Sequence, residues 1–243
     1  MERWLPPPAR PAPANGELFA VLVDLTAARG RLAQLTAALT DRERERAAQF
    51  ATDEWRDRWS AARGTLREVL GSALGISPAA VRLRYGAHGK PELDPASDPG
   101  ARELRFNISH SADRALIALA RAEVGADVEH LKPRRTDDIA RRFFAPGEQQ
   151  RLFAFDGSKR EAAFFRLWTC KEAFLKVTGE GLSRSTRSYE IEVDGSSARL
   201  LWAKGLPDAA RRYGVFPLEP GNGYAAAVVA EAQGLTLRRF RWP

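Results

Sequence analysis

Residues 124–129 read Val-Gly-Ala-Asp-Val-Glu and residues 164–182 read FFRLWTCKEAFLKVTGEGL, and these two stretches decide how the chain folds. In the first, apolar side chains alternate with glycine and acids, which is typical of a strand. The second is apolar on nearly every side, so we expect a helix that is largely buried. The sequence therefore predicts a core that contains both a helix and strands.

The acids of the first stretch, Asp127 and Glu129, point to the same face of the predicted strand. Like charges this close repel unless a cation, a proton or water compensates, and a hard divalent ion such as Mg²⁺ takes oxygen ligands of this kind. A half-exposed strand whose polar face is acidic would show the same spacing. This motif alone leaves both interpretations open.

The polar pair of the second stretch, Glu172 and Lys176, stands one helical turn apart in the favourable order of acid before base. An ordinary surface ion pair would look the same. On a mostly buried helix, however, such a pair needs further compensation, which a metal ion with phosphate oxygens would supply. Cys170 lies on the same apolar helix, where we expect it to be part of the core.

Two further motifs carry polar side chains. Residues 106–111 read FNISHS, a strand end in which Ser109 and His110 could hold phosphate oxygens, although a lone histidine in a turn is often structural. Lys90 lies between Gly89 and Pro91, which most simply form a turn. Neither motif indicates a site by itself.

Farther from these motifs, the chain alternates between helical and strand-like segments. Thr40 and Glu43 fit a capping box that opens an arginine-rich helical region, which we expect to run to about Leu74 with a possible break at Gly64. Strands are expected at 18–25, 81–85, 115–120 and 124–129. Helices are expected at 136–144, 147–154 and 159–178.

The last part of the sequence predicts two strand pairs, 188–193 with 198–203 and 224–230 with 235–241. Helical regions and strands in mixed order indicate an α+β fold. Residues 6–13 are rich in proline, so residues 1–17 are expected to form a flexible arm.

Composition narrows the class of protein. The net charge of +7 favours an anionic partner, which could be nucleic acid, a membrane face, a phosphate-rich ligand or an acidic protein. The single cysteine excludes an internal disulfide framework and a cysteine-based zinc site. Because no stretch has the length of a signal peptide or a bilayer span, we expect a cytoplasmic protein that does not enter a membrane.

Taken together, the motifs resemble those of the Sfp-type 4'-phosphopantetheinyl transferases. The stretches FNISHS, GADVE, FFAPGEQQRL and WTCKEAFLKVTGEGL occur in the order and at the intervals of that family, with GADVE in place of the usual GVDIE. The similarity extends upstream through HGKPEL and the arginine-rich helix. It covers roughly residues 18 to 230.

The resemblance implies two similar α/β halves, related by a pseudo-twofold axis, with coenzyme A bound between them. We place the N-terminal subdomain at 18–122 and the C-terminal subdomain, with the metal-binding and catalytic motifs, at 123–243. It also implies transfer of phosphopantetheine from coenzyme A to a serine of an acidic acyl or peptidyl carrier protein. We expect a monomer that binds no nucleic acid.

The resemblance assigns roles to individual residues, which we carry over by position. Mg²⁺ is expected on Asp127, Glu129 and Glu172, and catalysis on Glu172 and Lys176. Coenzyme A is expected to contact Lys176 and five further residues, namely Arg46, Arg58, Lys90, Ser109 and His110.

One position departs from the family pattern. Family members often carry a basic residue early in the arginine-rich helix, where this chain has Glu43. The capping-box role of Glu43 offers a local explanation. Recognition of the 3'-phosphate of coenzyme A must then depend on Arg46, Lys90 and His110, with Arg58 as a further candidate.

Two other functions would use similar residues. A metal-dependent phosphodiesterase or nuclease also needs clustered acids, a lysine and a basic surface, but common nucleases place the last acid and lysine two apart on a strand. A non-catalytic nucleic-acid-binding protein would explain the charge but not the buried pair of Glu172 and Lys176.

Overall fold

The computed structural model describes all 243 residues except 1–2, 87–88, 97–98, 133–134, 180 and 182–183. Of the motif residues quoted above, His88, Glu180 and Leu182 therefore lie outside the described residues.

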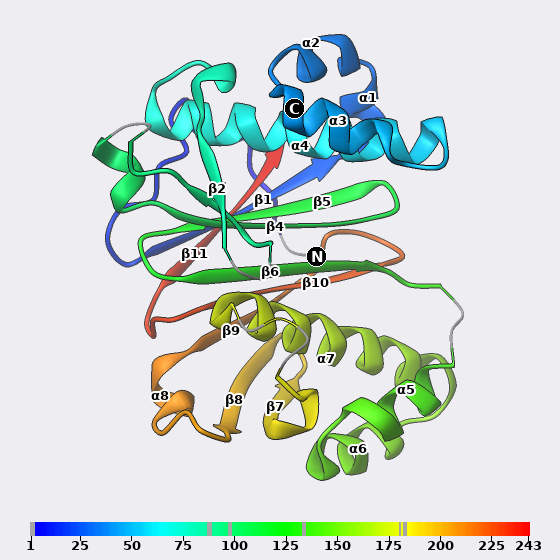
Figure 1. Ribbon diagram of the computed structural model, residues 1–243. Coiled ribbons are helices and arrows are strands. Elements are labelled where there is room, and N and C mark those ends of the chain that lie inside the picture. The colour runs from blue at the N-terminus through cyan, green and yellow to red at the C-terminus, as the bar shows by residue number, and fades with distance from the viewer. Residues whose placement is uncertain (1–2, 87–88, 97–98, 133–134, 180, 182–183) are drawn as a thin grey trace.

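The described chain forms two main sheets that lie face to face (Figure 1). The first has the strand order β11-β1-β5-β4, with β1 at Glu17–Asp24, β4 at Arg105–Ser111, β5 at Arg114–Ala120 and β11 at Thr236–Trp242. The second has the order β6-β10-β9-β8-β7, with β6 at Val124–His130, β7 at Tyr189–Asp194, β8 at Ser197–Ala203, β9 at Gly214–Leu218 and β10 at Tyr224–Ala230. A separate short pair consists of β2 (Leu83–Tyr85) and β3 (Pro91–Leu93).

Helices cover the outer face of each sheet (Figure 1). The first sheet carries α1 (Leu25–Arg29), α2 (Leu32–Ala37), α3 (Asp41–Ala48) and α4 (Asp53–Leu74). The second carries α7 (Gly157–Thr178), with α5 (Thr136–Phe143), α6 (Pro146–Phe153) and α8 (Ala209–Arg212) around it. The α+β class and the two similar halves expected from the sequence are thus confirmed.

The alternation of apolar residues along the strands produces three cores. One side of β1, with Phe19 and Val21, packs under the helices of the N-terminal half, while Leu18 and Ala20 face the other sheet. The core between the sheets consists mainly of alanine and valine, such as Val228. Small side chains allow the two sheets to approach closely, which fixes the position of one half against the other.

The last strand does not pair as predicted. The expected pair of 188–193 with 198–203 is present as β7 and β8, but β10 pairs with β6 and β9, and β11 lies parallel to β1 in the N-terminal sheet. Phe240 of β11 packs edge-on against Phe19, with 5.0 Å between ring centroids. Alternating patterns identify strands but not their partners, so the sequence could not indicate this return. The division at residue 122 stays a prediction, and the final strand crosses it.

Two other local expectations change. The arginine-rich helical region breaks at 49–52 rather than at Gly64, which lies inside α4. A Cβ at Gly64 would lie 2.7 Å from the carbonyl oxygen of Leu35, so this glycine permits close packing of α2 on α4. The expected N-terminal arm is bound to the fold at several points rather than loose. Among them, Leu5 bridges to β11 and the Arg10 guanidinium donates to the carbonyl oxygens of Ala73 and Leu74.

Among the described residues, no helix is both long and apolar enough to cross a bilayer.

Candidate active site between the two halves

Strands β4 and β6 lie side by side where the two sheets meet (Figure 1). Their polar side chains bridge the halves. The Ser109 hydroxyl donates to Asp127 Oδ1 at 2.9 Å, and the Ser111 hydroxyl donates to Glu129 Oε2 at 3.2 Å. The backbone N–H of Ala126 donates to the Asn107 side chain. Every second side chain of the FNISHS motif therefore contacts the acidic motif, because β4 and β6 run side by side in the same direction.

Helix α7 brings the second pair of polar residues to the same place. It packs on β6 at Gly125, where a Cβ would lie 2.1 Å from the carbonyl oxygen of Ala173. This close approach sets Lys176 Nζ at 2.7 Å from Asp127 Oδ1 and at 3.0 Å from the Ser109 hydroxyl. Asp127 is 4% exposed, so the carboxylate of its ion pair with Lys176 is largely desolvated, whereas the Lys176 side chain is 30% exposed.

The two oxygens of Asp127 differ in their surroundings. Oδ1 accepts from both Ser109 and Lys176, whereas Oδ2 is buried and has no hydrogen-bond partner among the described residues. An unsatisfied buried carboxylate oxygen is costly, because it has lost water without a replacement. Oδ2 is thus available to a ligand that is not part of the protein.

Glu172 faces the other acids of the site. Its pKa is raised, first by burial and then by the negative charge of Asp127, with a smaller contribution from Glu129 and an opposing one from Lys176. The four residues therefore share one electrostatic environment. The mutual repulsion of the three acids, Asp127, Glu129 and Glu172, would be relieved by a cation.

These acids fit a magnesium ion only in part. Across the described part of the chain, no three acidic, histidine or cysteine side chains are close enough to form a complete metal-binding group. Mg²⁺ is usually bound by one or two carboxylates together with water and substrate phosphates, and it does not need a complete protein cage. The free Oδ2 of Asp127 and the raised pKa of Glu172 agree with that mode of binding.

His110 lies at the edge of this acidic group. Part of the residue is exposed to solvent, yet its pKa is lowered by burial, by Lys176 and by Arg63, in that order. Arg63 belongs to α4 in the N-terminal half, which also contains His110, and we did not single it out from the sequence. The sequence indicates an arginine-rich helix but not which of its arginines faces the second half.

The other basic residues expected at coenzyme A have different neighbours. Lys90 Nζ is 3.3 Å from Glu123 Oε2, Arg58 donates to Asp113 at 2.9 Å, and Arg46 donates to the Gln49 side chain at 2.8 Å. No contact of these side chains with Ser109 or His110 occurs within the described ranges. Their roles stay predictions.

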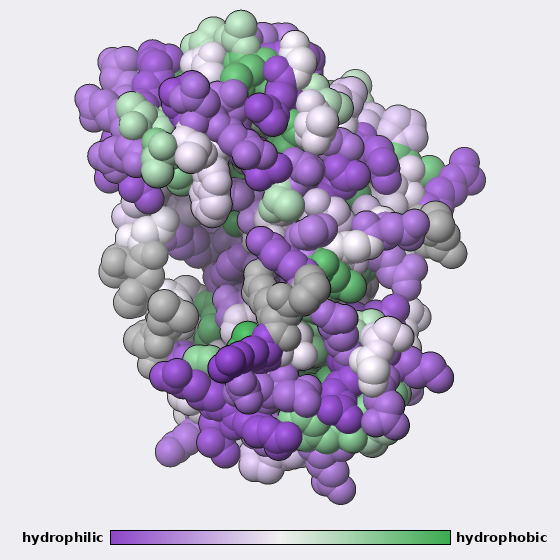
Figure 2. All heavy atoms as spheres, turned by 90° about the vertical axis from the view of Figure 1, so that its right-hand side faces the viewer, coloured by the Kyte–Doolittle hydropathy of each residue, from purple (hydrophilic) through white to green (hydrophobic). Residues whose placement is uncertain are grey.

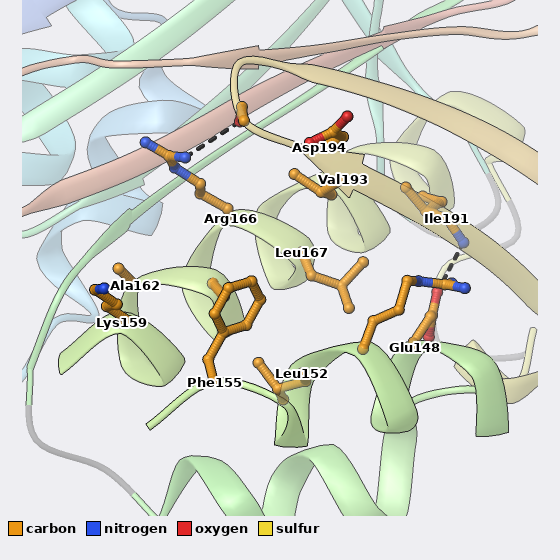
Figure 3. Close-up of a pocket in the computed structure, with 13 residues that line it drawn as sticks. Glu148, Leu152, Phe155, Lys159, Ala162, Arg166, Leu167, Ile191, Val193 and Asp194 are labelled. Carbon is orange, nitrogen blue, oxygen red and sulfur yellow. Dashed lines mark hydrogen bonds between the residues drawn. The ribbon is translucent and has the colours of Figure 1, made fainter. Parts of the chain in front are cut away.

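Two other features are separate from this site. Burial raises the pKa of Cys170 to about 12, which agrees with its expected place in the core. An apolar cavity of about 450 Å³ lies between α6, α7 and β7, with Leu152, Phe155 and Leu167 on its walls (Figure 3), and no predicted site residue lines it.

Figure 2 shows a hydrophilic hollow between the two halves, on the side of the molecule where β4 and β6 end.

Comparison with protein families agrees with this division into halves. Residues 123–229 match the family described as the 4'-phosphopantetheinyl transferase superfamily. Residues 26–122 match the family described as 4'-phosphopantetheinyl transferase, N-terminal. Together the two matches cover residues 26–229.

Three curated relatives extend over most of the chain. The 4'-phosphopantetheinyl transferase HetI of Nostoc sp. is 38% identical over 78% of this chain and 79% of its own length. A 4'-phosphopantetheinyl transferase of Bacillus subtilis is 30% identical over 73% of this chain and 76% of its own. The 4'-phosphopantetheinyl transferase Sfp of Bacillus subtilis strain 168 is 27% identical over 88% and 92%.

Proposed function

Because this chain belongs to the 4'-phosphopantetheinyl transferase superfamily, we propose that it transfers phosphopantetheine from coenzyme A to a carrier-protein serine and releases 3',5'-ADP. The observation that carries the site assignment is the contact of Asp127 with Ser109 across the halves and with Lys176 of its own half, with one buried oxygen left for a ligand.

Asp127, Glu129 and Glu172 would hold Mg²⁺ together with pyrophosphate oxygens of coenzyme A. When bound there, the ion supplies Lewis-acid chemistry that neutralises charge on the pyrophosphate. Asp127 can keep its pair with Lys176 through Oδ1, and the unpaired Oδ2 would be available to hold the ion.

The protein's own residues position the reacting groups. The carrier serine oxygen attacks the β-phosphorus, the bond from that phosphorus to the bridging oxygen breaks, and 3',5'-ADP leaves with the bridging oxygen. Lys176 and Ser109 bind the phosphate oxygens and stabilise the charge that develops on the leaving group. Glu172 accepts the serine proton, directly or through a water molecule.

We further propose that the carrier is acidic, that Mg²⁺ is the metal, and that the protein acts as a monomer in the cytoplasm without nucleic acid or membrane. Arg46, Arg58 and Lys90 are proposed to lie along the coenzyme A site. The nuclease and the nucleic-acid-binding alternatives find no support, because both halves match transferase families.

Intact-mass measurement tests the reaction. The protein is incubated with Mg²⁺, coenzyme A and a panel of apo carriers from fatty-acid, polyketide and nonribosomal-peptide systems, and we expect at least one carrier to gain the mass of one phosphopantetheine. Glu172→Gln should lower the rate by about 100-fold or more without unfolding the protein. Glu161→Gln, on the same helix but outside the site, should transfer normally.

Two results would contradict this assignment. If no carrier gains mass, the proposed reaction is wrong for this chain. If Glu172→Gln turns over at the rate of Glu161→Gln, Glu172 has no part in the mechanism.

A further inference from the structure

The carboxylate of Glu43, which replaces an expected basic residue, is held rigidly in the N-terminal half. It is 3% exposed, and Oε2 accepts hydrogen bonds from Arg67 Nε at 2.7 Å and from the Thr40 backbone N–H at 3.0 Å. Arg67 in turn donates to the carbonyl oxygens of Pro78 and Val81. The Glu43 side chain therefore cannot turn without breaking several buried hydrogen bonds.

The second oxygen of Glu43 faces Arg63. Oε1 lies 3.6 Å from Arg63 Nε, which is too long for a hydrogen bond but close enough for strong attraction at a buried position. The Arg63 guanidinium also lies over the rings of Trp59, at 5.3 Å, and Tyr85, at 6.0 Å. The acid and the two rings together restrict the direction in which Arg63 can point.

Arg63 has binding capacity that the protein does not use. Its side chain is 13% exposed, and its Nη1 is buried without a hydrogen-bond partner among the described residues. Glu43 is shared between Arg63 and Arg67, so this group of one acid and two guanidinium groups carries an excess positive charge. A buried charged donor without a partner is costly, and an oxyanion would satisfy it.

The position of Arg63 relative to the active site indicates which anion binds. Arg63 and Lys176 act on the same imidazole, that of His110, from opposite halves of the molecule. Lys176 is held by Asp127 and Ser109, which belong to the proposed pyrophosphate and metal site. A phosphate group at Arg63 would be held from the N-terminal half, whereas the phosphates at Lys176 would be held from the C-terminal half.

We propose that Glu43 positions Arg63 to bind the 3'-phosphate of coenzyme A, so that Arg63 supplies the charge that residue 43 lacks. This inference rests on the proposed transfer reaction, since coenzyme A is its substrate. A guanidinium can meet a phosphate monoester with two parallel hydrogen bonds, and Nη1 is available for one of them. Glu43 acts only through Arg63 and does not touch the substrate.

The test compares coenzyme A with 3'-dephospho-coenzyme A as phosphopantetheine donors, because the two differ only in the group that Arg63 would bind. We expect Arg63→Gln to raise KM for coenzyme A by about tenfold with kcat nearly unchanged. The same variant should leave kcat/KM for the dephospho form nearly unchanged. Glu43→Gln should produce the same selective loss, at a smaller size, because its amide no longer attracts the guanidinium.

Thr40→Ala provides the matched control for damage to the helix start. It removes both hydrogen bonds of the Thr40 hydroxyl, the one donated to Glu43 Oε2 and the one accepted from the Glu43 backbone N–H, but leaves the charge of Glu43 and its bond from the Thr40 backbone N–H in place. Thermal unfolding measures stability for all three variants. We expect Thr40→Ala to lose stability as Glu43→Gln does and to keep the wild-type preference for coenzyme A over its dephospho form.

The outcomes separate this inference from the proposed function. Wild-type protein that uses neither donor contradicts the transfer reaction itself. Wild-type protein that transfers normally, with Arg63→Gln reducing kcat/KM equally for both donors, contradicts the role of Arg63 in 3'-phosphate binding. A selective loss in Arg63→Gln that Glu43→Gln lacks, or that Thr40→Ala shares, contradicts the positioning role of Glu43.

Discussion

Charged residues from both halves of the molecule shift the pKa of the His110 imidazole. Burial, Lys176 and Arg63 each lower its pKa from the ordinary value of 6.5, so His110 stays neutral in the folded protein at neutral pH. Since the folded-state pKa is the lower one, the neutral form is favoured by folding. Stability is therefore lost as the pH falls from 6.5 toward the lowered pKa.

An anion near His110 should reverse this shift. We expect the His110 imidazole to titrate below pH 6.5 in the free protein and at higher pH when 3',5'-ADP is bound, because a phosphate group favours the protonated ring. Imidazole NMR titration measures both midpoints, and His110→Gln identifies the signal. A midpoint that does not move with saturating 3',5'-ADP would place His110 away from the nucleotide.

Single residues were predicted best where spacing along one element decides their neighbours. Asp127 and Glu129 share a face of β6, and Glu172 and Lys176 follow one another on α7, as their intervals require. Arg63 was missed because its importance comes from Glu43, Trp59 and Tyr85, which surround it only in the folded protein. The unequal oxygens of Asp127 could not be foreseen for the same reason.

At the scale of elements, the contact of β6 with α7 sets the geometry of the site. Gly125 has no room for a side chain, since a Cβ would lie 2.1 Å from the Ala173 carbonyl oxygen and 2.5 Å from the Val177 backbone nitrogen. The glycine of the GADVE motif therefore determines how close Asp127 comes to Lys176. A substitution at this position acts on the site without changing any polar residue.

We expect Gly125→Ala to push β6 away from α7, which lengthens the contact between Asp127 and Lys176. Transfer should fall by about tenfold or more, and the free energy of unfolding should drop by about 1–3 kcal/mol, as for overpacked cores. Urea unfolding and the mass assay measure the two effects. Gly86→Ala, where the nearest atom is 3.7 Å from the added Cβ, should change stability little. Equal behaviour of the two variants would contradict this account.

The position of α7 also depends on a buried ion pair. Lys171 and Glu148 are both fully enclosed, with Lys171 Nζ at 2.7 Å from each oxygen of Glu148, and the Ile191 backbone N–H donates to the same carboxylate. This pair joins α6, α7 and β7, and its lysine, Lys171, directly precedes Glu172 in the sequence. The helices themselves were predicted within a few residues, but the partner of Lys171 depends on tertiary packing and could not be read from periodicity.

At the scale of the whole molecule, the net charge of +7 is expected to attract an acidic carrier. With coenzyme A saturating, KM for such a carrier should rise by roughly tenfold between low and high salt, because screening slows the encounter. A carrier variant whose surface acids are replaced by amides is the control and should be less sensitive to salt. If KM for the acidic carrier does not depend on ionic strength, the carrier is not recognised by charge.

The two-halved architecture was expected from the family resemblance, whereas the path of the chain between the halves was not. Element types and their order follow from local patterns, which the sequence carries directly. The choice of β1 rather than β10 as partner of β11 depends on which edge is open once both sheets have formed. That information exists only at the level of the assembled molecule.

The return of β11 to the N-terminal sheet affects how the protein can be made. Val23 pairs with Trp242, so the first sheet lacks one edge strand until residue 242 has left the ribosome. Until then β1 presents an unpaired edge, which can join strands of other chains. Contacts between residues so distant in sequence also form slowly. Synthesis that stops short of residue 236 would thus leave a nascent chain with both helical layers but an open, aggregation-prone sheet.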